Sequence, residues 1–349
     1  MVSKENNHIL AHQQGALGVI TLNRPEALNA TSYEMVLGIN TALTAFAENS
    51  DIKHIAIMSN SDRAFCVGGD IRMAYAAMAE NDQDLCEMYF REEYQLVHRL
   101  ATFSKPIYAF INGLCLGGGM GLSIHCTARV AGENAVFGMP ETAIGFFPDV
   151  GAAYFYNQLS DSAEGMYLAL TGHKFNRDHA IRNGIATHVI DQSQWESITA
   201  QLAAGKALEA CTFTSAEVIH TTFHECIQTT LVHHATLPEL IATLPAHTLN
   251  ELRTKSPLSI AVTYAYMQRA RGLSLKTILE QDFALAVNFV RHGEFKEGIR
   301  ALLIDKDKTP KWHYPWLNNG TIPPIPFDII ENMFDYKATS LFPLNEVSQ

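Results

Sequence analysis

The chain has 349 residues, of which 47% are hydrophobic, and this is the composition of a globular protein with a sizeable core. Its formal net charge of −11 at pH 7 argues against a nucleic-acid partner, because proteins that bind nucleic acids usually carry a basic stripe. No apolar run approaches the roughly 18–20 residues that a membrane-spanning helix needs, so we expect no membrane partner. The length allows one large domain or two modest ones.

The six cysteines contain no Cys-x-x-Cys pair, and a chain of this length does not depend on a disulfide scaffold. We therefore interpret them as reduced thiols. The first residues show neither the basic and apolar pattern of a secretory signal nor the arginine content of a transit peptide. These observations predict a cytoplasmic protein.

The first half of the chain alternates between strand and helix patterns. Short apolar runs bounded by turn residues predict strands at 18–22, 54–58, 106–111, 129–131, 135–137 and 185–190. Amphipathic patterns that follow capping residues predict helices at 31–48, 82–103 and 120–126. Strands that alternate with helices indicate an α/β fold.

From about residue 192 onward, helical patterns replace the strand patterns. Thr236, Ser256 and Ser274 are suitable N-cap residues, and they predict a short helix after 236 and longer helices at 256–270 and 274–291. We place a domain boundary near residue 205, with an α/β core at 1–205 and a mainly helical region at 206–349. This second region would cover the active site, form an oligomer interface, or do both.

Two glycine-rich turns are the main functional candidates. The first is AFCVGGD at 64–70, and the second is NGLCLGGGMG at 112–121, which follows a predicted strand and precedes a predicted helix. Such turns can aim two backbone N–H groups at one developing negative oxygen. A glycine triplet also has a structural interpretation, as a tight turn with close packing of helix on sheet. Neither turn matches a phosphate-binding fingerprint.

A carboxylate segment, MPETAIGFFPDVG at 139–151, follows the second turn. Glu141 could be an ordinary acid at a helix start and Asp149 an ordinary N-cap. However, residues 144–150 are apolar apart from Asp149, and a charge in such a run requires a partner or a function. We therefore expect these carboxylates to carry acid–base chemistry.

In order and spacing, these segments resemble the enoyl-CoA hydratase/isomerase (crotonase) superfamily. The motif Asn23–Pro25 followed by Leu28–Ala30 also matches, and the resemblance extends from about residue 15 to residue 312. It implies an α/β fold in which ββα units form a crotonase-type spiral, with a helical C-terminal part and the CoA-ester site in the core. Superfamily members often form trimers, so it also implies a homo-oligomer whose form the sequence leaves open.

The resemblance assigns roles to individual residues. It implies that the backbone N–H groups of Gly69 and Gly118 form an oxyanion hole and that CoA lies across residues 64–69. It places Glu141 and Asp149 at catalytic positions. The implied substrate-binding residues are Ala64, Cys66, Gly68, Glu93, Gly118, Glu141 and Asp149.

One departure from the superfamily pattern favours hydrolysis. Hydratases carry a second glutamate three residues after the middle glycine, where this chain has Gly121, and glycine cannot transfer a proton. We expect Glu141 to act either as a base on water or as a nucleophile that forms a transient acyl-enzyme anhydride. Asp149 and Glu93 would then bind the hydroxyl of the acyl group.

The segments Phe147–Asp149 and 297–307 are typical of the hydrolase branch. The implied reaction is hydrolysis of the 3-hydroxyisobutyryl-CoA thioester to 3-hydroxyisobutyrate and CoA, a step of valine catabolism. CoA is part of the substrate, and no metal or other cofactor is implied, since the spaced pair His220 and His224 lacks a third ligand. The alternatives are an enoyl-CoA hydratase or isomerase, and a catalytically silent acyl-CoA-binding protein.

Overall fold

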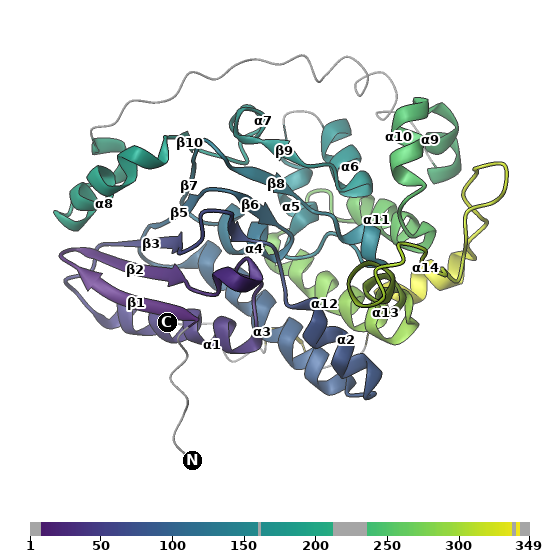
Figure 1. Ribbon diagram of the computed structural model, residues 1–349, viewed down its shortest axis with the longest axis horizontal. Coiled ribbons are helices and arrows are strands. Elements are labelled where there is room, and N and C mark those ends of the chain that lie inside the picture. Colours follow the sequence, from purple (N-terminus) through teal and green to yellow (C-terminus); the bar gives the residue numbers. More distant parts are fainter. Residues whose placement is uncertain (1–7, 160–161, 212–235, 337–339, 343–349) are drawn as a thin grey trace. The chain divides into compact units, whose positions relative to one another are not determined.

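The computed structural model describes residues 8–159, 162–211, 236–336 and 340–342 (Figure 1). His220 and His224 therefore lie outside the described residues. The chain folds as two compact units, and each unit is assembled from three separate stretches of sequence. Unit 1 contains Met1–Asp70, Leu96–Gly138 and Phe175–Thr221, and unit 2 contains Ile71–Gln95, Met139–Lys174 and Thr222–Gln349.

This division differs from the boundary expected near residue 205. Residues 71–95 and 139–174 belong to unit 2 because their helices pack against the C-terminal helices. A helical pattern in the sequence shows that a helix has an apolar face, but it does not show which distant helix covers that face.

Unit 1 contains a six-stranded sheet in the order β1-β2-β3-β5-β7-β10. β1 and β2 are antiparallel, and the other neighbouring pairs are parallel. The strands are β1 (Ile9–Gln14), β2 (Leu17–Leu22), β3 (His54–Ser59), β5 (Ile107–Ile111), β7 (Ala128–Ala131) and β10 (His188–Val189). The five strands after β1 confirm the predicted strands, whereas β1 is an addition at the sheet edge whose residues are mostly exposed.

A second sheet of unit 1 has the order β4-β6-β8-β9. Its strands are β4 (Ala64–Cys66), β6 (Leu114–Leu116), β8 (Val136–Gly138) and β9 (Phe175–Asn176). β4 and β6 are parallel neighbours, and each leads into one of the two glycine turns. The sheet therefore brings the two turns to the same edge, because parallel strands end on the same side.

Helices and a central apolar cluster complete unit 1. Its helices are α1 (Tyr33–Glu48), the last turns of α3 (Gln83–Thr102), α4 (Gly118–Ile124), α7 (Arg177–Arg182) and α8 (Trp195–Ala203). The Ser32 hydroxyl caps α1 by accepting a hydrogen bond from the N–H of Met35 at 3.3 Å. Trp195 of α8 packs edge-on against Phe110, with ring centroids 5.3 Å apart, and joins the core that covers the large sheet.

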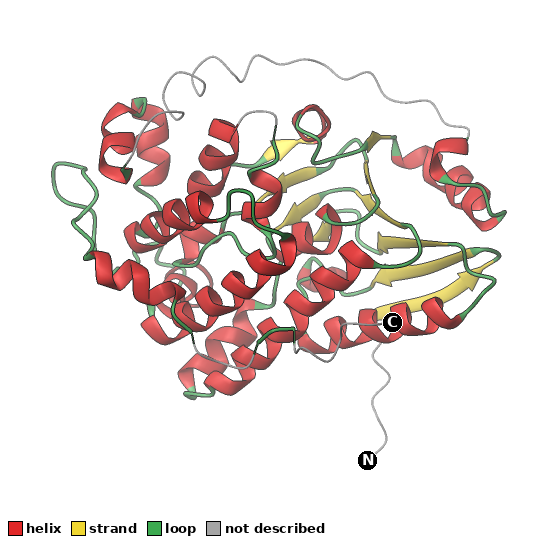
Figure 2. Cartoon of the chain, turned by 180° about the vertical axis from the view of Figure 1, so that it is seen from behind, coloured by secondary structure: helices red, strands yellow, loops and turns green. Residues whose placement is uncertain are grey.

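The described residues of unit 2 form helices joined by loops, with no strand among them (Figures 1 and 2). Besides the first part of α3, its helices are α2 (Ile71–Ala79), α5 (Ala152–Tyr156), α6 (Ser162–Thr171), α9 (Leu237–Thr243), α10 (Ala246–Leu252), α11 (Pro257–Arg269), α12 (Leu275–His292), α13 (Glu294–Ile299) and α14 (Phe327–Phe334). Ser256 and Ser274 cap α11 and α12, as their sequence context predicts. Thr236 caps α9 in a capping box with Glu239.

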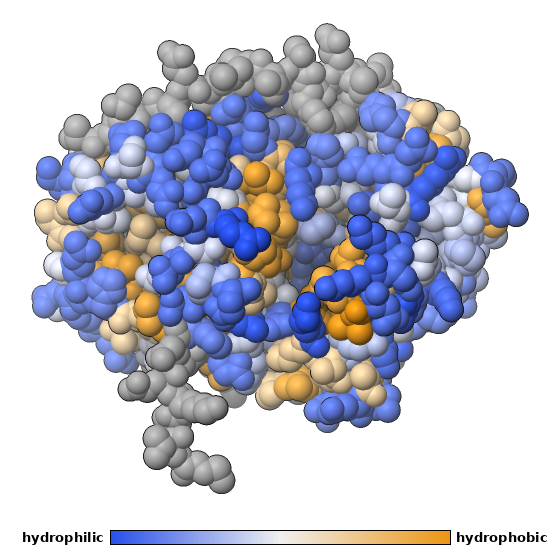
Figure 3. All heavy atoms as spheres, in the orientation of Figure 1, coloured by the Kyte–Doolittle hydropathy of each residue, from blue (hydrophilic) through white to orange (hydrophobic). Residues whose placement is uncertain are grey.

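Hydrophilic side chains cover much of the face seen in Figure 3, and hydrophobic side chains form smaller areas between them. The large hydrophobic residues that are exposed are Leu10, Leu37, Met88, Leu302, Ile304, Leu317 and Phe327. Among the described residues, no helix combines the length and the apolar character that crossing a membrane requires.

Candidate active site

The first glycine turn lies directly after β4. The N–H of Thr31 donates to the Gly68 carbonyl at 2.8 Å, and the N–H of Asp70 donates to the Thr31 carbonyl at 2.9 Å. These two bonds hold Gly69 between them. Among the described residues, the N–H of Gly69 has no hydrogen-bond partner, so it is available to a ligand.

The second glycine turn packs against the first within unit 1. A Cβ placed on Gly68 would lie 3.3 Å from the amide nitrogen of Gly118, and one placed on Gly119 would lie 2.2 Å from the carbonyl oxygen of Cys66. Gly118 is the first residue of α4, where backbone N–H groups have no partner within the helix. The structure therefore brings Gly68, Gly69 and Gly118 together, beside the strand that carries Ala64 and Cys66.

Two polar residues near the N-terminus, Arg24 and Asn29, hold the first turn in place. The buried Asn29 side chain donates to the Phe65 carbonyl at 3.0 Å, and the Arg24 guanidinium pairs with the Asp70 carboxylate at 2.7 Å. These contacts fix the two ends of the β4 turn. Asn29 and Arg24 thus stabilise the conformation of the first turn.

Glu141 begins a short 3₁₀ helix, η2 (Glu141–Ile144), in unit 2. The N–H of Ser256 donates to the Thr142 carbonyl at 3.0 Å, so the start of α11 holds this helix. At its other end, a Cβ on Gly298 would lie 2.2 Å from the carbonyl group of Ile144. The backbone that carries Glu141 therefore sits in a closely fitted position.

Asp149 and Glu93 also lie in unit 2, and both are held by tyrosines of α3. The Tyr94 hydroxyl donates to Asp149 Oδ2 at 2.7 Å, and the Tyr89 hydroxyl donates to Glu93 Oε1 at 3.1 Å. Glu93, Asp149 and Glu141 are all less than one-tenth exposed. Among the residues that the structure describes, no lysine or arginine pairs with any of these three acids.

The acids lie next to a cluster of aromatic side chains. Phe146 and Phe147 separate Glu141 from Asp149 in sequence, and both are buried. Phe146 stacks on Phe90 at 5.6 Å, and Phe147 stacks on Phe289 at 5.6 Å between ring centroids. Aromatic rings cannot replace the hydrogen bonds that water makes to a carboxylate. These surroundings therefore disfavour the ionised form of the acids.

Burial raises the pKa of all three carboxyl groups, and the charge of Asp149 adds to this effect at Glu93 and Glu141. Burial raises the pKa of Asp149 to about 7, while the bond from Tyr94 acts in the opposite direction. Burial and the charge of Asp149 raise the pKa of Glu93 to about 8. The same two causes raise the pKa of Glu141 well above its ordinary value. Titratable groups perturbed in this way are concentrated at catalytic sites.

Other polar residues of this cluster were not predicted from the sequence. Tyr94 holds Asp149, and Asp282 accepts a hydrogen bond from the N–H of Gly151 at 2.7 Å. The Tyr156 hydroxyl and Glu141 Oε2 are buried without a hydrogen-bond partner in the described part of the chain, which leaves both available to substrate or water. Asp282 could have been noticed as an acid on the apolar face of a predicted helix.

The cysteines near the glycine turns are suited to packing. Cys66 and Cys115 are fully buried, and burial raises the pKa of the Cys115 thiol above its usual range. A thiol held in this form is a poor nucleophile. The described cysteines form no disulfide with one another: Cys66, Cys86, Cys115, Cys126 and Cys211.

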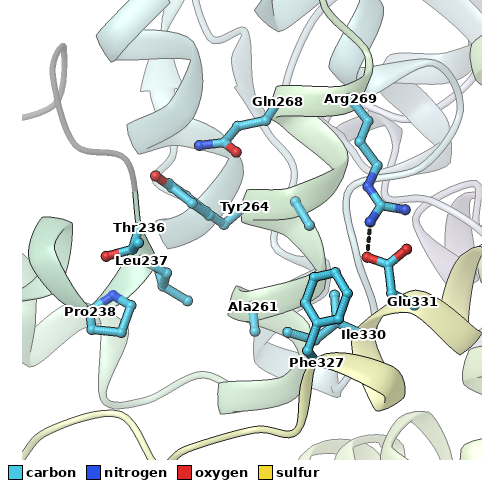
Figure 4. Close-up of a pocket in the computed structure, with 11 residues that line it drawn as sticks. Thr236, Leu237, Pro238, Ala261, Tyr264, Gln268, Arg269, Phe327, Ile330 and Glu331 are labelled. Carbon is cyan, nitrogen blue, oxygen red and sulfur yellow. Dashed lines mark hydrogen bonds and ion pairs between the residues drawn. The ribbon is translucent and has the colours of Figure 1, made fainter.

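A separate pocket of about 380 Å³ lies among α9, α11 and α14 of unit 2 (Figure 4). Tyr264, Phe327 and Ile330 contribute to its lining, and the Arg269 guanidinium is paired with the Glu331 carboxylate. None of the site residues predicted from the sequence lines this pocket.

Two solved structures resemble the chain along almost its whole length. An enoyl-CoA hydratase from Rhodobacter sphaeroides 2.4.1 has a TM-score of 0.86 and 28% identity, with 94% of this chain and 97% of that chain covered. A carnitinyl-CoA dehydratase from Mycobacterium thermoresistibile has a TM-score of 0.86 and 27% identity, with 97% and 99% covered. They confirm the crotonase-type α/β fold with its helical C-terminal part.

Curated relatives carry a more specific name. The "3-hydroxyisobutyryl-CoA hydrolase, mitochondrial" of Danio rerio is 35% identical over 332 residues, which is 89% of this chain and 86% of the relative. The protein of the same name from Homo sapiens is 34% identical, with 87% and 83% covered.

These names contradict the expectation of a cytoplasmic protein, because they point to the mitochondrion. The lack of a disulfide among the described cysteines is no guide here, because it does not distinguish the cytoplasm from other reducing compartments. The family described as enoyl-CoA hydratase/isomerase matches residues 17–322. The chain belongs to this family.

Proposed function

We propose that this chain is an acyl-CoA thioester hydrolase that converts 3-hydroxyisobutyryl-CoA and water to 3-hydroxyisobutyrate and CoA, a step of valine catabolism. The name of its relatives supports this reaction. The observation that carries the proposal is the cluster of Glu93, Glu141 and Asp149, which are buried together with no cationic partner in the described part of the chain. The substrate contains its own CoA, and the reaction requires no metal or redox cofactor.

The N–H groups of Gly69 and Gly118 would bind the thioester oxygen. As the carbonyl carbon becomes tetrahedral, this oxygen gains negative charge, and two fixed N–H groups stabilise that charge more than they stabilise the ground state. Removing one such donor from an oxyanion hole typically costs about 10²–10³ in rate. The free N–H groups and the close packing of the two turns support this role.

Glu141 would supply the base or the nucleophile. Burial raises the pKa of Glu141 well above its ordinary value, and a higher pKa makes its carboxylate a stronger base. As a base, Glu141 takes a proton from water while the water oxygen bonds to the carbonyl carbon, and the proton then goes to sulfur as the C–S bond breaks. As a nucleophile, its oxygen bonds to the carbonyl carbon while the C–S bond breaks and CoA leaves as the thiolate. Water then hydrolyses the anhydride, which regenerates Glu141 and releases the proton that the thiolate takes up. Incorporation of ¹⁸O from labelled water into Glu141 during a single turnover would identify the second route.

Asp149 and Glu93 would bind the 3-hydroxyl group of the acyl chain. Both carboxyl groups are buried, so a substrate without this hydroxyl would leave them without its hydrogen bond. Sites built in this way reject analogues that lack the group strongly. Isobutyryl-CoA should therefore be a poor substrate, and equal turnover of the two esters would contradict this role.

The direct test is release of CoA thiol from (S)-3-hydroxyisobutyryl-CoA, measured beside loss of crotonyl-CoA absorbance. We expect thiol release by the wild type, its loss in Glu141→Gln and Asp149→Asn, and no change in crotonyl-CoA. Consumption of crotonyl-CoA without thiol release would favour the hydratase or isomerase alternative, although Gly121 of α4 offers no side chain for that chemistry. Tight binding of both esters without turnover would indicate a silent acyl-CoA-binding protein.

A further inference from the structure

The backbone that follows Asp149 forms a strained turn. The N–H of Ala152 donates to the Asp149 carbonyl at 2.8 Å, and the two residues between them have positive φ angles, 50° at Val150 and 77° at Gly151. These angles and this bond define a type I′ turn, which strongly prefers asparagine, aspartate or glycine at both central positions. Glycine adopts this conformation readily, whereas a β-branched residue such as valine does so only under constraint.

The constraint comes from Asp282 of α12. One of its oxygens, Oδ2, accepts a hydrogen bond from the N–H of Gly151 at 2.7 Å, and the other accepts one from the Tyr266 hydroxyl of α11. Asp282 is fully buried, and α12 packs against α5, which begins directly after Gly151. The proposed reaction has no other use for this carboxyl group.

We propose that Asp282 is a positioning residue for Asp149, because it holds the turn of Asp149, Val150 and Gly151 in its left-handed conformation. This inference depends on the proposed function for the role of Asp149 in the reaction. Tyr94 fixes the carboxylate of Asp149, and Asp282 fixes the backbone that carries it. Without Asp282, Gly151 would have an unpaired buried N–H group, and Val150 would relax toward an ordinary conformation and rotate Asp149 away.

The first test compares Asp282→Ala with Asp282→Asn and with Glu280→Gln. Glu280 is a matched control because it is also an acid of α12, but its carboxylate bonds to the backbone of Leu341 and Phe342. In Asp282→Ala we expect faster hydrogen exchange at the Gly151 amide and a loss of kcat on the order of 10²-fold, with KM much less affected, as for other small misplacements of reacting groups. Asp282→Asn retains an oxygen that can accept from Gly151 and should recover much of both properties.

The second test is rescue by relief of strain. Val150→Gly produces a Gly-Gly turn that adopts the left-handed conformation without help. Adding Val150→Gly to Asp282→Ala should therefore restore part of the lost kcat, although the loss of the buried valine lowers the melting temperature. If Asp282→Ala does not fold, Tyr266→Phe releases Asp282 from one side without emptying its position, and Gly151 exchange is measured in that variant.

Unchanged Gly151 exchange in Asp282→Ala, or in Tyr266→Phe if Asp282→Ala does not fold, would overturn the inference. Faster exchange with wild-type kcat would also overturn it, because Asp282 would then stabilise the turn without positioning Asp149. A wild type that releases no thiol would refute the proposed function instead. In that case, Gly151 exchange and its recovery in Asp282→Asn still decide whether Asp282 holds the turn.

Discussion

Replacing Tyr94 by phenylalanine removes one oxygen atom from the candidate site. The Tyr94 hydroxyl donates a 2.7 Å hydrogen bond to Asp149, and both residues are buried. A hydrogen bond to a charged group contributes about 1.5–3 kcal/mol, and one pKa unit corresponds to about 1.4 kcal/mol. Because this bond favours the ionised form, its loss should raise the pKa of Asp149 by about 1–2 units.

The assay is the pH dependence of kcat for thiol release from 3-hydroxyisobutyryl-CoA. If an ionised Asp149 accepts the substrate hydroxyl, the acidic limb of the profile should move to higher pH in Tyr94→Phe by the same about 1–2 units. Tyr264→Phe is a matched control, because Tyr264 is a phenol of unit 2 that lines the separate pocket. Coincident acidic limbs in Tyr94→Phe and the wild type would refute the argument.

Three further predictions concern the backbone of the site and its buried charge. Gly119→Ala should destabilise the protein to urea by about 1–3 kcal/mol, since its Cβ would lie 2.2 Å from the Cys66 carbonyl oxygen. Gly298→Ala, with its Cβ 2.2 Å from the Ile144 carbonyl group, should displace the helix of Glu141 and lower kcat; wild-type kcat with unchanged stability would contradict this. The folded-state pKa of Asp149 is raised to about 7, so the folded state binds more protons, and the melting temperature should fall from pH 4 to about pH 7 with a smaller slope in Asp149→Asn.

Local patterns in the sequence were sufficient to predict much of the fold. The apolar strands of the large sheet and the capped helices α11 and α12 lie where their residues predict them. The edge strand β1 was missed because its exposed residues show no alternation, and its pairing with β2 alone makes it a strand. The division into units was missed because helix α2 and the segment 139–174 show no sign of which distant helices they contact.

Candidate site residues that lie within one short segment could be predicted from their residue types and spacing. The two glycine turns and the carboxylates of the segment 139–151 could be found in this way. The residues that hold Asp149 and its turn could not be found in this way. Tyr94 is 55 residues away from Asp149, and Asp282 is 131 residues away from Gly151, whose N–H donates a hydrogen bond to it. Tertiary packing brings these residues together. A tyrosine or an aspartate on a helix does not show in the sequence which distant residue it contacts.

The absence of a cation near these acids, within the described residues, argues that they serve chemistry and not folding. A carboxylate that stabilises a fold normally lies at the surface or pairs with an opposite charge, as Asp70 does with Arg24. Glu93 and Asp149 instead have raised pKa values from burial, which means that their ionised forms oppose folding at neutral pH. Such a cost is retained where activity requires the groups. The strained Val150 turn beside Asp149 adds a second cost at the same place, and strain of this kind concentrates at functional sites.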